Sequence, residues 1–108
     1  MEPKPAPAAA KSKISRLLFE KVVDLPSERI NVVIRHVTLP VGFKTPAHTH
    51  KGPGPRYVLK GKVEIVEGAD IRTVSEGEVF WESGAIMTAE NVSEGPMELV
   101  AFQFLPVE

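Results

Sequence analysis

Short apolar stretches separated by turn-forming residues make up the chain from about residue 30 onward. The densest of them, residues 30–39, is rich in β-branched side chains and predicts a strand. Alternation places Val33, Arg35, Val37 and Leu39 on one face of it and Val32, Ile34, His36 and Thr38 on the other. Apolar residues on both faces are expected for a strand in a sheet that is covered on both sides.

The stretches that follow are short and are separated by glycine, proline or serine. They predict further strands at residues 43–50, 56–59, 62–66, 71–74, 78–81, 86–91 and 97–104, the first of them irregular around Pro46. We expect residues 56–59 and 62–66 to pair as a hairpin around Lys60 and Gly61. Several short strands with such turns predict an all-β sandwich or barrel.

The beginning of the chain has a different composition. Residues 1–13 are mostly Pro, Ala and Lys without apolar periodicity, and they predict a flexible N-terminal tail. A solvated tail is the simpler interpretation, and an arm that crosses to a partner subunit is the alternative. Residues 14–108 are expected to form one domain, because a chain of 108 residues supports a single core. Residues 14–24 allow a short helix or a strand, and we favour a strand.

Composition narrows the classes of function. The formal net charge is −1, so no global field favours nucleic acid or an anionic membrane as a partner. The chain has no cysteine, which excludes disulfides, thiolate metal sites and cysteine nucleophiles. No apolar run approaches the roughly 20 residues of a membrane helix. The first residues lack the apolar core of a signal peptide, so a cytoplasmic location is expected.

His48 and His50 are the strongest candidates for a functional site in the sequence. They are one residue apart in a segment predicted to be extended, so they point to the same side. Two imidazoles on one face can bind the same metal ion.

The spacing of Gly42, His48, His50 and Gly61 resembles the first motif of the cupin family, although Gly54 stands at the position of its glutamate. The resemblance covers about residues 30–104 and implies a double-stranded β-helix barrel with the histidines inside its mouth. In metal-binding cupins, the two histidines and the glutamate of this motif, with one histidine of a second motif, hold a divalent metal.

The second motif begins at Gly77, and its histidine position is occupied by Met87 or Thr88, depending on the register. We favour Met87, because that register also restores a glycine and an asparagine of the motif. Two of the four ligands are therefore absent, and the resemblance implies a reduced site in which His48 and His50 hold at most a weakly bound divalent metal ion. The other histidine, His36, is better explained as a residue at a strand surface or in the core than as a ligand. Three carboxylates within strands or near turns are better explained as solvated than as ligands: Glu64, Glu82 and Glu90.

Three further residues are candidates for ligand binding. Arg56 lies two residues after Gly54 and shares its face in a regular strand, where its guanidinium could bind a carboxylate or a phosphate. A surface arginine is the simpler interpretation. Tyr57 and Trp81 could line a pocket and stack on a planar ligand, although packing in the core or in an interface explains them more simply.

These patterns favour a small-molecule-binding cupin barrel with a reduced metal site centred on His48 and His50. The alternative is a divalent-metal-dependent cupin enzyme of the dioxygenase or isomerase type with non-standard ligands. A third possibility is a structural or interaction module that dimerises through its sheets, as the resemblance to single-domain cupins would allow. The resemblance, together with the need to cover sheet edges, implies a homodimer.

Overall fold

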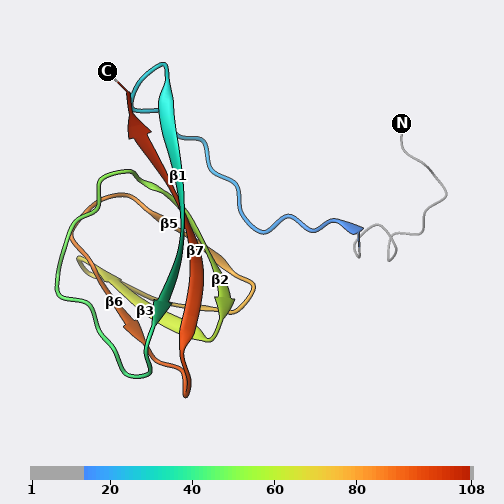
Figure 1. Ribbon diagram of the computed structural model, residues 1–108, viewed down its shortest axis with the longest axis vertical. Coiled ribbons are helices and arrows are strands. Elements are labelled where there is room, and N and C mark those ends of the chain that lie inside the picture. The colour runs from blue at the N-terminus through green and yellow to red at the C-terminus, as the bar shows by residue number, and fades with distance from the viewer. Residues whose placement is uncertain (1–13, 108) are drawn as a thin grey trace.

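The strands of the protein begin at Ile30 in the computed structural model, which describes residues 14–107 (Figure 1). Within these residues the strands are β1 (Ile30–Leu39), β2 (Gly54–Lys60), β3 (Lys62–Glu67), β4 (Asp70–Ser75), β5 (Val79–Glu82), β6 (Thr88–Asn91) and β7 (Met97–Pro106). The predicted strand at residues 30–39 is confirmed at both ends, and those after residue 55 are confirmed with small shifts. The all-β class is therefore confirmed.

Two antiparallel sheets surround the interior. One sheet has the strand order β1-β7-β2-β5, and the other has the order β4-β3-β6. β1 and β7 pair along their whole length, from Ile30 opposite Pro106 to Leu39 opposite Met97. Figure 1 shows these two long strands bordering one side of the molecule, with β3 and β6 across the interior from them.

β2 and β3 do not form the hairpin that we predicted around Lys60 and Gly61. β2 pairs with β5 and β7, whereas β3 pairs with β4 and β6. Gly61 lies between them with a φ of 79°, in the left-handed region that favours glycine. The chain therefore passes here from one sheet to the other. The prediction was wrong because turn residues show where a strand ends, and not which strand it pairs with.

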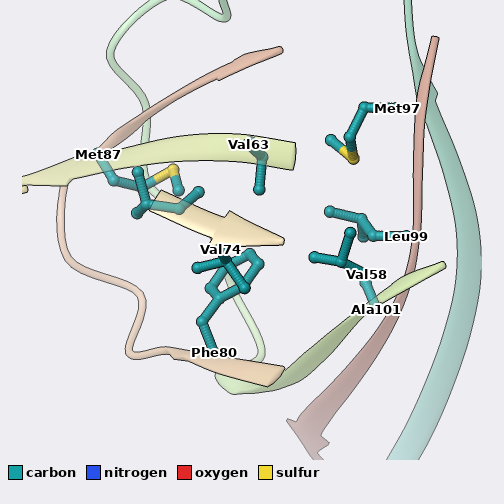
Figure 2. Packing of buried hydrophobic residues seen from close by; sticks show 9 residues of the cluster. Val58, Val63, Val74, Phe80, Met87, Met97, Leu99 and Ala101 are labelled. Carbon is teal, nitrogen blue, oxygen red and sulfur yellow. The ribbon is translucent and has the colours of Figure 1, made fainter. Parts of the chain in front are cut away.

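The space between the sheets is filled by buried apolar side chains from both of them (Figure 2). They are Val58, Val63, Ile65, Val74, Phe80, Met87, Met97, Leu99 and Ala101. Three polar or charged residues of the described chain are also buried: Arg56, Glu82 and Asn91. The Asn91 side-chain amide donates to the carbonyl oxygens of Leu39, Pro40 and Gly95, so this residue joins two loops and has a structural role.

The segment that carries the two histidines is not a regular strand, contrary to our prediction for residues 43–50. Two isolated bridges attach it to the chain around β6, with Lys44 opposite Glu90 and His48 opposite Met87. Pro46 lies between these bridges and has no backbone N–H to donate, which interrupts the ladder.

Residues 14–24 were also wrongly predicted as a strand, because they pair with no strand in the described part of the chain. Several apolar side chains here remain exposed, and Val22 is 99% exposed. An apolar composition predicted a strand, but no partner strand lies beside this segment. The predicted tail, residues 1–13, lies outside the described residues. No helix among residues 14–107 is long and apolar enough to cross a membrane.

Candidate functional site

A cavity of about 200 Å³ lies in the interior of the fold. Its apolar lining includes Ile65, Phe80, Met87 and Leu99, which are all buried core residues. Its polar lining consists of Arg35, Thr45, His48, His50, Arg56, Glu82 and Gln103. Arg35 is exposed and the two histidines are half-buried, so these three side chains lie toward solvent, whereas Arg56 and Glu82 are buried with the apolar residues of the deep part.

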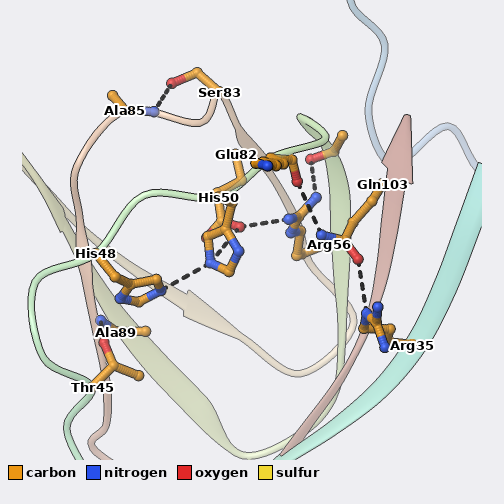
Figure 3. A network of polar contacts seen from close by, with 12 residues as sticks. Arg35, Thr45, His48, His50, Arg56, Glu82, Ser83, Ala85, Ala89 and Gln103 are labelled. Carbon is orange, nitrogen blue, oxygen red and sulfur yellow. Dashed lines mark hydrogen bonds and ion pairs between the residues drawn. The ribbon is translucent and has the colours of Figure 1, made fainter. Parts of the chain in front are cut away.

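His48 and His50 point into this cavity together, as their spacing predicted (Figure 3). Their Nε2 atoms lie 2.9 Å apart, and the ring planes meet at 74°. The Nδ1 atom of His48 lies 2.7 Å from the carbonyl oxygen of Pro46, so in the neutral ring it carries the proton and donates. The Nε2 atom of His48 then accepts a hydrogen bond from the Nε2–H group of His50.

Arg56 and Glu82 form a buried ion pair in the wall of the cavity. Arg56 is 3% exposed and Glu82 is 6% exposed. The Arg56 Nη2 atom lies 2.6 Å from Oε1 of Glu82, and Nη1 donates to the carbonyl oxygens of Gly54 and Phe102 at 2.9 Å each. The expectation that Glu82 is solvated was wrong, because its charge is compensated by a guanidinium from the neighbouring strand.

Gly54 lies directly opposite Glu82 across the β2–β5 pair. The cavity carboxylate therefore comes from β5, while the position that resembles the motif glutamate on β2 has no side chain. A Cβ atom at position 54 would overlap the carbonyl oxygen of Phe102. Glycine is thus required here by the close approach of β7.

The ion pair and the cavity wall shift two pKa values. Burial lowers the pKa of Arg56 from its ordinary value, and the nearby Glu82 carboxylate opposes that shift. Burial also lowers the pKa of His50, whose Nε2 atom lies 3.4 Å from Oε1 of Glu82. Glu82 raises the pKa of His50, whereas His48 and Arg56 lower it further. The net direction favours a neutral His50 ring.

Tyr57 and Trp81 do not line this cavity. Alternation along β2 and β5 turns Arg56, Phe80 and Glu82 inward, so the residues between them face outward. The Trp81 ring lies against Phe19 and Phe104, with 6.3 Å between ring centroids in each pair. Packing, the simpler of the two interpretations, describes Trp81 in this structure. His36 also faces away from the cavity, and its Nε2 atom lies 2.9 Å from a carboxylate oxygen of Glu98.

Arg35 and Gln103 line the cavity but were not among the predicted site residues. The Nε–H group of Arg35 donates to Oε1 of Gln103 at 3.0 Å, and Nε2 of Gln103 donates to the carbonyl oxygen of Lys51 at 3.2 Å. Figure 3 shows this pair on the side of Arg56 opposite the histidines. Alternation along residues 30–39 placed Arg35 between Val33 and Val37 on one face. A charged side chain on this otherwise apolar face could have marked Arg35 as a site residue.

The residues of the cavity do not fit the four-ligand metal centre of metal-binding cupins. Met87 lies opposite His48 and lines the cavity, which places it, and not Thr88, at the histidine position of the second motif. The glutamate position is Gly54, and Glu82 is already bound by Arg56. Within residues 14–107, no group of three or more His, Cys, Asp or Glu side chains is placed to hold a metal ion. Two of the four ligand positions of such a centre therefore carry no ligating side chain.

The fold is a double-stranded β-helix barrel with a cavity in its interior. The cupin domain family matches residues 35–103, which is more than half of the 108-residue chain. The chain therefore belongs to the cupin family. A comparison with curated proteins finds no match.

Solved structures support the fold. A predicted oxalate decarboxylase from Thermotoga maritima is 22% identical, with a TM-score of 0.58 over 69% of this chain and 66% of its own. The cupin domain of Schizosaccharomyces pombe Cnp3 is 19% identical, with a TM-score of 0.62 over 81% of this chain and 61% of its own. An oxalate oxidase in complex with the substrate analogue glycolate is 24% identical, with a TM-score of 0.59 over 68% of this chain and 41% of its own. The chain thus spans less than two thirds of the length of each of these structures.

Proposed function

We propose that this protein is a cupin barrel that binds a small molecule in the cavity beside His48 and His50, and that its metal site is reduced. The observation that best supports this is the Arg56–Glu82 ion pair, in which the protein's own cation binds the buried carboxylate of the cavity. A metal ion that approached Glu82 would be repelled by the guanidinium. A concave, mainly apolar lining with a few placed polar groups is typical of small-molecule sites.

The alternative is a divalent-metal-dependent cupin enzyme of the dioxygenase or isomerase type, with a metal held weakly by His48, His50 and water. One observation favours it. The Nδ1 atom of His48 is bonded to the Pro46 carbonyl oxygen, and metal-ligating histidines commonly orient their second nitrogen in this way. The oxalate oxidase among the structural relatives has the same fold, but one fold supports many chemistries. A cytoplasmic location remains an expectation from the sequence.

Metal analysis separates the two candidates. We expect protein purified without added metal to contain well under one equivalent of iron, manganese, nickel, copper or zinc per chain. We also expect no change in that content in a His48→Ala, His50→Ala variant. A near-stoichiometric metal that is lost in this variant would instead support the enzyme and overturn the reduced site.

Ligand binding in the cavity is tested by filling it. Ala89 lines the cavity and is half-buried, so Ala89→Leu should abolish the shifts that small molecules induce in the His48 and His50 ring signals in NMR spectra. Ala85→Leu is the matched control, because Ala85 is exposed and does not line the cavity. Equal shifts in both variants would place the binding elsewhere.

A further inference from the structure

Arg35 is a second guanidinium at the cavity, and among residues 14–107 no carboxylate compensates its charge as Glu82 compensates that of Arg56. We propose that the ligand is a small carboxylate with an apolar body, that Arg35 binds its carboxylate, and that Gln103 positions Arg35. This inference rests on the proposed function, because it names the chemical class that the same cavity binds.

Arg56 is already engaged and is not the group that receives the carboxylate. Its Nη2 atom is paired with Glu82 at 2.6 Å, and its Nη1 atom donates to two backbone carbonyl oxygens. At 3% exposure it has little surface left for a ligand. A carboxylate that approached it would also meet the like charge of Glu82.

Arg35 has the opposite properties. It lines the cavity and is exposed, and no carboxylate of residues 14–107 lies within ion-pair distance of its guanidinium. Its Nε–H group is bonded to Oε1 of Gln103. The edge formed by its two Nη atoms is then the one available to bind a carboxylate through two parallel hydrogen bonds.

Gln103 fixes the direction of that edge. Both ends of its amide are bonded, since Oε1 accepts from Arg35 and Nε2 donates to the Lys51 carbonyl oxygen. Arg35 lies on β1 and Gln103 on the neighbouring strand β7, where Gln103 pairs with Val33, two residues before Arg35. The guanidinium is thus oriented before a ligand arrives, which reduces the entropy cost of binding.

The charges of the cavity favour an anion, and its shape favours an apolar body. Apart from the histidines, the charged groups in the lining are the two guanidinium groups and one carboxylate, so one positive charge is left over. The deep part is formed by Ile65, Phe80 and Leu99. A volume of about 200 Å³ is below the range of roughly 300–1,000 Å³ that drug-sized ligands use, so the ligand is small.

The test compares hexanoate with its neutral isostere hexanamide, using NMR titration of the full chain and the ring signals of His48 and His50 as reporters. We expect hexanoate to bind about tenfold to hundredfold more tightly than hexanamide, as for a hydrogen bond to a charged group. Affinity should rise by about fourfold for each methylene between acetate and hexanoate, because each one is buried against the apolar lining.

Variants connect this preference to the two residues. Arg35→Gln should remove the preference for hexanoate over hexanamide while the amide affinity changes little. Gln103→Glu should have a similar effect, because the new carboxylate would pair with Arg35 and compete with the ligand. Arg29→Gln is the matched control, since Arg29 is also an exposed arginine but does not line the cavity.

The outcomes distinguish this inference from the proposed function. Equal affinity for the acid and the amide, or an unchanged preference in folded Arg35→Gln, would overturn the assignment of Arg35 while leaving a cavity that binds small molecules. If neither probe shifts the histidine signals at millimolar concentration, both the inference and the proposed function are wrong for this ligand class.

Discussion

At the scale of single residues, Arg56 and Glu82 determine the charge of the cavity. Both are almost fully buried, and Nη2 of Arg56 lies 2.6 Å from Oε1 of Glu82. Nη1 of Arg56 donates to two backbone carbonyl oxygens. Removing one partner of such a pair typically costs about 3–5 kcal/mol, because the other charge is left uncompensated. The pair is therefore a fixed part of the cavity wall with no net charge, and apart from the histidines Arg35 is the other charged side chain of the lining.

His50 should titrate below its ordinary pKa of 6.5, because burial, His48 and Arg56 outweigh the opposing effect of Glu82. An NMR titration of its ring signals measures the midpoint directly. Glu82→Gln should lower the midpoint further, since this variant removes the group that raises it. A midpoint at or above 6.5 in the folded protein would contradict the environment described for the ring.

The same shift predicts the pH dependence of stability. As the pH falls below 6.5, the unfolded chain gains a proton on His50 before the folded chain does, so the free energy of unfolding decreases until the folded-state pKa is passed. Urea unfolding between about pH 7.5 and 5.5 should show a smaller loss for His50→Gln than for the wild type.

The spacing of His48 and His50 predicted that they share one side, and the family resemblance implied that this side faces the interior. For Arg56 the simpler interpretation, a surface arginine, was wrong, because the side chain is 3% exposed. The sequence did not predict that Glu82 is buried, because it looked like a solvated carboxylate at the end of a short strand. The partner that keeps Glu82 charged lies on β2, and only the β2–β5 pairing brings the two together. Arg35 carried a local signal, a charge within an apolar face, but its bond to Gln103 depends on the pairing of β1 with β7.

At the scale of elements, the close approach of β7 to β2 at Gly54 leaves no room for a glutamate at the motif position. Any side chain at position 54 meets the backbone of Phe102, and a backbone atom cannot turn away as a flexible side chain can. The absence of the glutamate is thus built into the spacing of two strands.

Substitution of Gly54 should therefore be costly whatever residue is introduced. We expect Gly54→Ala to lower the free energy of unfolding by about 2 kcal/mol or more, from overpacking. Gly54→Glu should lose at least as much and should not gain affinity for a divalent metal. Gly95→Ala is the control, because a Cβ there meets no atom within 4 Å, and it should change stability by less than about 0.5 kcal/mol. Denaturant unfolding with a metal titration checks these values, and a stable, metal-binding Gly54→Glu would contradict them.

Strand positions were largely predictable from the sequence, whereas pairings were not. The strands at residues 30–39 and 97–106 follow from dense β-branched or apolar runs, and their pairing is long-range. Gly61 marked a turn correctly, yet the turn joins two different sheets. Residues 14–24 show the converse error, since an apolar run without a neighbouring strand was predicted as one.

At the scale of the whole molecule, the outer face of the four-stranded sheet and the segment before it carry exposed apolar side chains. Ile34 on β1 is 61% exposed and faces away from the cavity, and Leu17 and Val22 in the preceding segment are 72% and 99% exposed. Phe19 of this segment already lies against Trp81 on the outer side of β5. Contiguous exposed apolar surface can serve as an interaction site.

We propose that this surface joins two copies of the chain, because a two-fold dimer uses the same patch on both subunits and the segment can then cross to its partner. Light scattering after gel filtration should give twice the 11.8 kDa mass of the chain. Ile34→Glu should shift the mass toward the monomer, since it places a charge in the apolar contact. Ile71→Glu is the matched control, because Ile71 is 64% exposed but lies on β4 of the other sheet. A monomeric wild-type protein, or a dimer that only Ile71→Glu disrupts, would show that this face is not the interface.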